Sequence, residues 1–160
     1  KQLLFNESLE YQIPLHPYNQ IGDYEGILIG GNLSIIYSLL GSDTSLEGKD
    51  KILFLEDWYE NWYHVDRMLM SLKRANILPQ IKGLILGNFT FMDVENENIV
   101  DYNHPFDPTT YDIIKTYTQD LNIPICYQFP AGHTGHNIAM KFGAKVKLSI
   151  QSNSVTLQYI

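Results

Sequence analysis

Short apolar runs alternate with segments of helical periodicity from Gly26 onward, and this alternation most strongly limits what the chain can fold into. The runs at 26–29, 51–56, 82–86 and 124–127 have the length of strands. Successive strand–helix units build a parallel sheet, because each helix packs back across the sheet before the next strand begins. We therefore predict an α/β fold with a largely parallel sheet flanked by helices.

Three helices are expected between these strands. The first runs from about Leu33 to Leu40, with Asn32 as its N-cap. The third begins at Asp107 and Pro108, since proline suits the first turn of a helix. The second and longest follows the strand at 51–56 and carries an apolar stripe of Trp62, Val65, Leu69 and Leu72.

The two ends of the chain have a different pattern. Residues 144–150 and 154–160 alternate apolar with polar side chains across a polar turn, which predicts a carboxyl-terminal antiparallel hairpin. A strand-like stretch at 11–13 lies among turn residues. The polar segment from Asn88 to Pro105 has no clear period, and we interpret it as an insertion or flexible loop.

Composition limits the class of protein. The chain has 160 residues, 44% of them hydrophobic, which suits one domain over 1–160. A net charge of −7 provides no basic surface, so we expect neither nucleic acid nor anionic membrane as a partner. No apolar run approaches the ~20 residues of a membrane span. With Cys126 as the only cysteine, no internal disulfide can form, which suits a cytoplasmic protein.

The carboxyl ends of parallel strands are where ligands bind in such folds. Glu56 is the last residue of the predicted strand at 51–56, and His133 follows the predicted strand at 124–127. Asp57 and Glu60 have the spacing of a helix N-cap and capping box, which leaves Glu56 freer to be functional. His133 lies in a loop between Gly132 and Gly135. A carboxylate and an imidazole at one crevice form the acid–base half of a catalytic triad. The competing interpretation of Glu56 is a strand-end carboxylate bound to backbone amides.

A nucleophile for such a triad is not evident. No Gly-x-Ser-x-Gly elbow occurs, Cys126 lies inside a predicted strand, and Ser34 lies in the first turn of a helix. Either the Glu–His pair is not a triad or its third member lies elsewhere. Zinc bound by His133 and His136 is a weaker alternative, because the spacing is not that of a helical zinc motif. We expect no metal and no cofactor.

The segment Gly30-Gly31-Asn32 could present backbone amides to a substrate carboxylate at a helix N-terminus. The alternative is a tight strand-to-helix turn without a ligand. The remaining histidines, His16, His64 and His104, are expected to be ordinary surface side chains.

Several segments follow one another in the order found in a known family. They are Glu25-Gly26, Gly30 to Ser34, Ile52 to Asp57 with Glu60 and Tyr63, Asp66 to Leu69, Ile81 to Phe89, Ile123-Pro124 and Gly132-His133. In these segments the chain resembles the LD-carboxypeptidase family, which includes murein tetrapeptide carboxypeptidases and microcin C self-immunity proteins. The resemblance covers Glu25 to Ile150. The stretch at 93–103 is longer than the family's pattern, and Met140 to Gly143 replaces a leucine-proline-leucine-glycine run.

The resemblance implies a Ser-Glu-His triad divided between two domains, with Glu56 and His133 in the catalytic roles. The serine and the oxyanion hole would belong to an amino-terminal domain. The chain opens at Lys1 without an initiator methionine, so we expect 1–160 to be the carboxyl-terminal domain alone, with that amino-terminal domain as its partner. Such a fragment should fold yet hydrolyse nothing.

For the intact protein, the resemblance implies hydrolysis of the bond between an L-diamino acid and the terminal D-alanine of murein tetrapeptide. The segment Asp66 to Leu69 favours this murein-recycling reaction. The first alternative is hydrolysis of a microcin C-type acyl-sulfamate amide. The second is a ligand-binding or dimerising module without catalysis. Family members are commonly dimers, so a homodimer is a further expectation.

Overall fold

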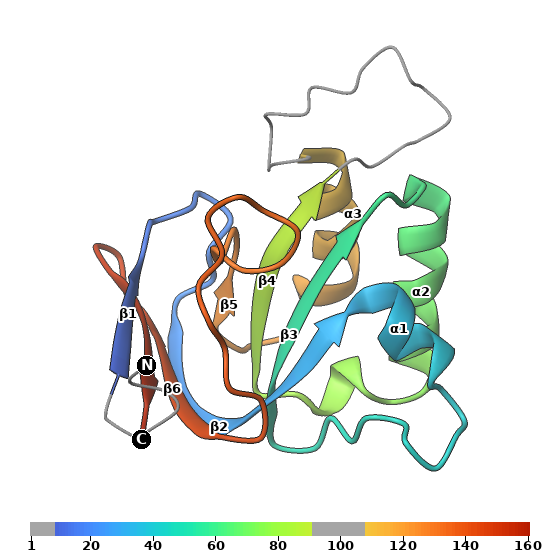
Figure 1. Ribbon diagram of the computed structural model, residues 1–160, viewed down its shortest axis with the longest axis horizontal. Helices are drawn as coiled ribbons and strands as arrows, with labels where there is room; N and C mark the ends of the chain where they lie inside the picture. Colours follow the sequence, from blue (N-terminus) through green and yellow to red (C-terminus); the bar gives the residue numbers. More distant parts are fainter. Residues whose placement is uncertain (1–8, 91–107) are drawn as a thin grey trace.

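The computed structural model describes residues 9–90 and 108–160 as one seven-stranded sheet with helices packed on it (Figure 1). The strand order is β1-β7-β6-β2-β3-β4-β5. In chain order the elements are β1 (Leu9–Ile13), β2 (Gly22–Asn32), α1 (Leu33–Ser38), β3 (Lys51–Trp58), α2 (Trp62–Arg74), the 3-10 helix η2 (Leu78–Gln80), β4 (Gly83–Thr90), α3 (Pro108–Thr118), β5 (Ile125–Cys126), β6 (Lys145–Ile150) and β7 (Val155–Tyr159).

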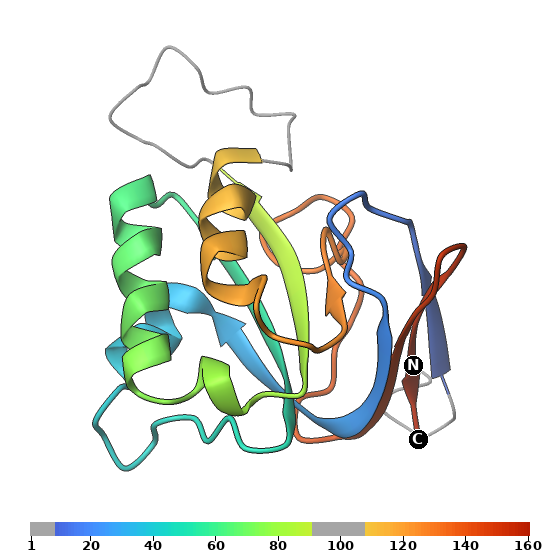
Figure 2. The ribbon, with the colours of Figure 1, turned by 180° about the vertical axis from the view of Figure 1, so that it is seen from behind.

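The strands β2, β3, β4 and β5 are parallel, as the alternation of runs predicted. In the register of β2 and β3, Asn32 lies opposite Glu56, so both strands end at the same edge of the sheet. The helices α1, α2 and α3 all cover one face, which Figure 2 shows from behind. The predicted α/β class is confirmed, and the helices lie on one side of the sheet.

Side chains of β3 and β4 alternate between two apolar clusters. Leu53 and Leu84 point toward the helices, whereas Ile52 and Ile85 point toward the opposite face. That second face is covered by apolar side chains of β1, β6 and β7 and by Phe129 and Ala131. Because both faces are buried, the central strands have continuous apolar sequences.

The carboxyl-terminal hairpin is confirmed, and it also extends the main sheet. Strand β6 pairs antiparallel with the first half of β2, where Gly22 lies opposite Ile150 and Ile27 opposite Lys145. Strand β2 therefore begins four residues before the predicted run at 26–29. The sequence hides this first half, because Asp23 and Glu25 are exposed and interrupt the apolar pattern.

The prediction that Asp57 is a helix N-cap is wrong. Strand β3 continues to Trp58, and a bulge between Leu55 and Asp57 shifts its register against β4. The residue before α2 is Asn61, so Glu60 does not form a capping box. Its carboxylate instead lies 2.8 Å from Nδ1 of His64, one helical turn away.

Three smaller expectations have different outcomes. His16 is not an ordinary surface residue, because its ring stacks on Tyr127 and its burial lowers the pKa of the imidazole. Residues 88–90 of the predicted loop belong to β4, while 91–105, His104 and the proposed cap Asp107 lie outside the described residues. In the described ranges, none of the helices has the length and apolar character needed to cross a bilayer.

Candidate active site

The side chains of Glu56 and His133 meet at the carboxyl-terminal edge of the sheet. Nδ1 of His133 lies 2.7 Å from Oε2 of Glu56, although the two residues are 77 positions apart in the chain. Glu56 comes from β3, and His133 comes from the loop that follows β5. This loop is held against β4, since the amide of Phe129 donates to the carbonyl of Leu86 at 2.8 Å. This backbone hydrogen bond places the loop beside the end of β3, so His133 lies next to Glu56.

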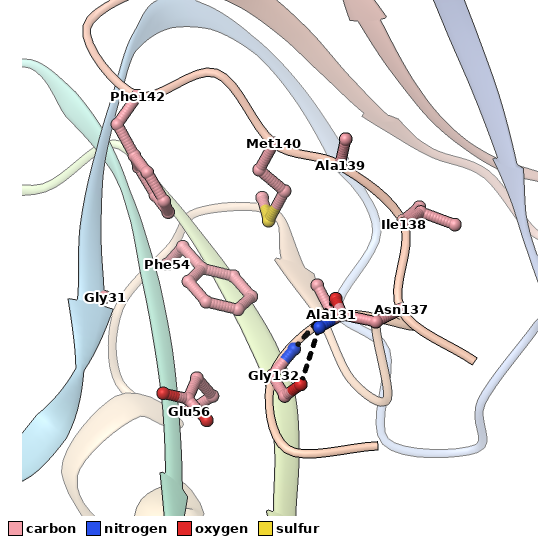
Figure 3. A pocket seen from close by; sticks show the side chains of 10 residues that line it. All are labelled: Gly31, Phe54, Glu56, Ala131, Gly132, Asn137, Ile138, Ala139, Met140 and Phe142. Atoms are coloured by element: carbon pink, nitrogen blue, oxygen red, sulfur yellow. Dashed lines mark hydrogen bonds between the residues drawn. The ribbon is translucent and has the colours of Figure 1, made fainter. Parts of the chain in front are cut away.

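Gly132 makes this approach possible. Its φ of +118° lies in the region that favours glycine, and a Cβ at this position would lie 2.9 Å from Oε2 of Glu56. Its backbone also exchanges two hydrogen bonds with the side-chain amide of Asn137, drawn as dashed lines in Figure 3. The conformation of the loop at Gly132 therefore leaves room for the carboxylate of Glu56.

The two partners differ in their exposure to solvent. The side chain of Glu56 is 8% exposed, whereas that of His133 is 50% exposed. A carboxylate can only accept, so Nδ1 of His133 donates and Nε2 is left as the proton acceptor of the ring. Among the residues that the structure describes, none hydrogen-bonds to Nε2. The arrangement suits an imidazole that accepts a proton at Nε2.

Two further residues hold His133, and the sequence analysis missed both. The ring of Trp58 stacks on the imidazole with centroids 5.6 Å apart and an interplanar angle of 14°. Oγ1 of Thr90 donates to the backbone carbonyl of His133 at 3.3 Å. A signal for Trp58 existed, because a residue two positions after Glu56 shares its side of an extended strand.

Asp57 points away from this pair, toward the start of α1. Its carboxylate accepts from Nδ2 of Asn32 at 2.7 Å and from the amides of Ser34 and Trp58 at 3.0 and 2.8 Å. Burial is the largest influence and, together with the charge of Glu60, raises the pKa of Asp57 even though these three hydrogen bonds lower it. Asp57 ties β3 to the first turn of α1.

The segment proposed to bind substrate lies beside Glu56, and its three residues have different surroundings. Gly30 lets β2 and β3 approach closely, since a Cβ there would overlap the backbone of Phe54. Asn32 caps α1 as predicted, because its Oδ1 accepts from the amide of Ile35 at 3.1 Å. Gly31 has open space around it.

Gly31 and Glu56 both line an open cleft of about 440 Å³, shown in Figure 3. Its remaining walls are mainly apolar, with the rings of Phe54 and Phe142 on one side and the stretch from Ile138 to Met140 facing them. Such a cleft, apolar apart from a few polar groups, has the character of a small-molecule site.

The candidate nucleophiles considered in the sequence are not available to His133. Cys126 is fully buried, which raises the pKa of its thiol to about 12. The hydroxyl of Ser34 donates to Oδ1 of Asn32. Within 9–90 and 108–160, no group of three His, Cys, Asp or Glu side chains is arranged to hold a metal ion, and His136 is exposed.

The chain is similar in sequence to proteins of known family. The chain is 29% identical over 160 residues to a probable murein peptide carboxypeptidase of Bacillus subtilis, covering 99% of this chain and 48% of the relative. It is 25% identical to the microcin C7 self-immunity protein MccF of Escherichia coli, covering 87% of this chain and 39% of that protein. The chain thus spans about half or less of the length of these relatives.

A solved structure has the same fold. The crystal structure of muramoyltetrapeptide carboxypeptidase from Oxalobacter formigenes superimposes with a TM-score of 0.75 and 28% sequence identity, covering 95% of this chain and 49% of the other. The family model of the LD-carboxypeptidase C-terminal domain matches residues 25–148, a range that runs from within β2 to within β6 and includes both members of the Glu–His pair. The chain therefore belongs to the LD-carboxypeptidase family.

Proposed function

We propose that this chain supplies the acid and the histidine of a serine-type LD-carboxypeptidase. The observation that carries the proposal is the 2.7 Å contact between Oε2 of Glu56 and Nδ1 of His133 at the carboxyl-terminal edge of the sheet. A carboxylate in this position fixes the tautomer of the imidazole and stabilises the imidazolium. Nε2 of this half-exposed side chain is then directed to a reacting group.

In the proposed reaction, Nε2 of His133 takes the proton of a serine hydroxyl while the serine oxygen attacks the peptide carbonyl. The protonated His133 then gives this proton to the leaving amine, and the peptide remains as an ester on the serine. A water molecule, activated by the same nitrogen, releases the shortened peptide as a carboxylic acid and regenerates the serine. Glu56 keeps its negative charge throughout.

We propose that the serine and the oxyanion-hole donors come from a separate amino-terminal domain. Supporting this, the described part of this chain offers no hydroxyl or thiol to Nε2 of His133. The 160-residue chain alone should therefore fold without hydrolysing peptides. The intact enzyme, in which the chain is joined to a nucleophile-bearing domain, should be active.

The proposed substrate is a murein tetrapeptide, cleaved between an L-diamino acid and the terminal D-alanine. The names of the Bacillus and Oxalobacter proteins support this choice. Of the predicted binding residues, Gly31 lines the cleft beside Glu56, and we propose that its backbone faces the peptide. Asn32 would contribute by holding this segment against Asp57.

We further propose a cytoplasmic location, which the single buried thiol of Cys126 supports. A homodimer remains a prediction.

Because the chain is similar to MccF, an aminoacyl-sulfamate is a second candidate substrate that must be tested. The intact enzyme should be assayed with a murein tetrapeptide and, separately, with an aminoacyl-sulfamate. Release of D-alanine with no hydrolysis of the sulfamate supports the proposal. Hydrolysis of the sulfamate alone contradicts the choice of substrate while leaving the chemistry of the pair in place.

Substitutions in the intact enzyme test the roles of the pair. Glu56→Gln and His133→Ala should each lower kcat by about 10³-fold or more, as losses within a triad do. Matched controls are Glu47→Gln, an exposed carboxylate, and His136→Ala, an exposed imidazole in the same loop as His133. Both controls should keep wild-type kcat. Wild-type turnover in Glu56→Gln or His133→Ala would instead favour a binding module without catalysis.

A further inference from the structure

The hydrogen bond to Glu56 does not by itself fix the catalytic imidazole. A hydrogen bond tolerates a range of angles, so small changes in χ1 and χ2 can still tilt the ring while Nδ1 stays bonded to the carboxylate, and this tilting moves Nε2. The side chain of His133 is half exposed, so the apolar core does not limit this motion. A second contact must define the plane of the ring.

Trp58 supplies such a contact. Its indole lies almost parallel to the imidazole, at an angle of 14° and a centroid distance of 5.6 Å, which is the geometry of an offset stack. The hydrogen bond of Thr90 goes to the backbone carbonyl of His133 and not to the ring. Among the described residues, Trp58 is the side chain that makes a ring contact with His133.

The backbone determines where this indole lies. Trp58 is the last residue of β3, two positions after Glu56, so both side chains reach the same side of the strand. Its amide donates to Oδ1 of Asp57, and the following amide of Tyr59 donates to the carbonyl of Thr90 at 3.1 Å. The end of β3 therefore places both the carboxylate of Glu56 and the indole of Trp58 against His133.

We propose that Trp58 is a positioning residue that holds the plane of the His133 ring so that Nε2 points at the nucleophile. This role rests on the proposed function, but its first test does not. The indole does not touch the reacting atoms. It acts by limiting the orientations of a ring that Glu56 has already anchored.

The first test is NMR spectroscopy of this 160-residue chain. An aromatic ring stacked on His133 shifts the carbon-bound protons of the imidazole upfield. Trp58→Leu should remove this shift, whereas Trp58→Phe, which keeps a flat aromatic face, should restore part of it. Tyr37→Leu is the control, because Tyr37 is an aromatic residue of similar exposure on α1, 43% against 45% for Trp58. It should leave the His133 resonances unchanged.

The second test is kinetic and uses the intact enzyme. Trp58→Leu should lower kcat by about tenfold to a hundredfold with KM nearly unchanged, because misdirection of Nε2 affects the reaction more than binding. Trp58→Phe should recover most of the loss, and Tyr37→Leu should have wild-type kinetics. Thermal unfolding of each variant shows whether a loss of activity follows from unfolding.

Two results would overturn the role of Trp58. One is a Trp58→Leu variant whose imidazole protons resonate as in the wild type. The other is a Trp58→Leu variant that loses the upfield shift while kcat is retained. An intact enzyme that hydrolyses neither test substrate would contradict the proposed function, and the NMR result would still decide whether Trp58 stacks on the His133 ring.

Discussion

The carboxylates of Glu56 and Asp57, consecutive on β3, point to opposite faces of the sheet. Glu56 meets His133 on the face covered by the loop after β5, and Asp57 meets Asn32 and the first turn of α1 on the helical face. Successive side chains of a strand alternate in this way. The end of β3 therefore has two roles. Glu56 is the candidate catalytic carboxylate, and Asp57 binds the turn between β2 and α1.

Asp57→Ala should destabilise the fold. The residue is 1% exposed, and its carboxylate accepts hydrogen bonds from Asn32, Ser34 and Trp58. Alanine leaves these three donors without their acceptor, at a cost of about 2 kcal/mol in the free energy of unfolding. Urea denaturation at neutral pH measures this loss. Asp43→Ala, at an exposed carboxylate, should change stability by less than about 0.5 kcal/mol.

The effect of Asp57 should depend on pH in a defined direction. Burial raises the pKa of Asp57 above its usual 3.8, so the folded chain holds this proton to higher pH than the unfolded chain. Its contribution to stability is complete below pH 3.8 and is lost as the pH rises through the folded-state pKa. The difference in unfolding free energy between wild type and Asp57→Ala should therefore shrink between pH 3 and pH 7. A difference that grows over this range would contradict the assignment.

Gly132→Ala should separate Glu56 from His133. The added Cβ would lie 2.9 Å from Oε2 of Glu56 and would sit at a φ of +118°, so the loop must move. In the intact enzyme we expect kcat to fall by about a hundredfold, since a displacement near 1 Å is enough for such a loss. Gly135→Ala in the same loop is the control. Its Cβ would meet nothing within 4 Å, and it should keep wild-type activity.

Cys126 should react with thiol reagents only after unfolding. The side chain is fully buried in β5, and burial raises its pKa to about 12, so the reactive thiolate is scarce and shielded. Ellman's reagent at pH 8 should give no rapid colour with the folded chain. Addition of denaturant should release one equivalent, because the sequence has one cysteine. Rapid reaction of the folded chain would show that β5 opens readily.

The sequence by itself determined the parallel strands β2 to β5, the helices between them and the terminal hairpin. These elements follow from local periodicity and from caps such as Asn32, which operate within a few residues. It also marked Glu56 and His133, because both stand where parallel strands end.

Only the tertiary structure decided how these parts combine. The pairing of β6 with the first half of β2, the extension of β3 through Asp57 and the stack of Trp58 on His133 all join residues distant in the chain or depend on such contacts. The local pattern at Asp57 and Glu60 favoured a helix start, but pairing with β4 and hydrogen bonds to α1 kept Asp57 in the strand. Long-range hydrogen bonds and burial outweighed local preference there, because the preference of a cap is worth only about 1 kcal/mol.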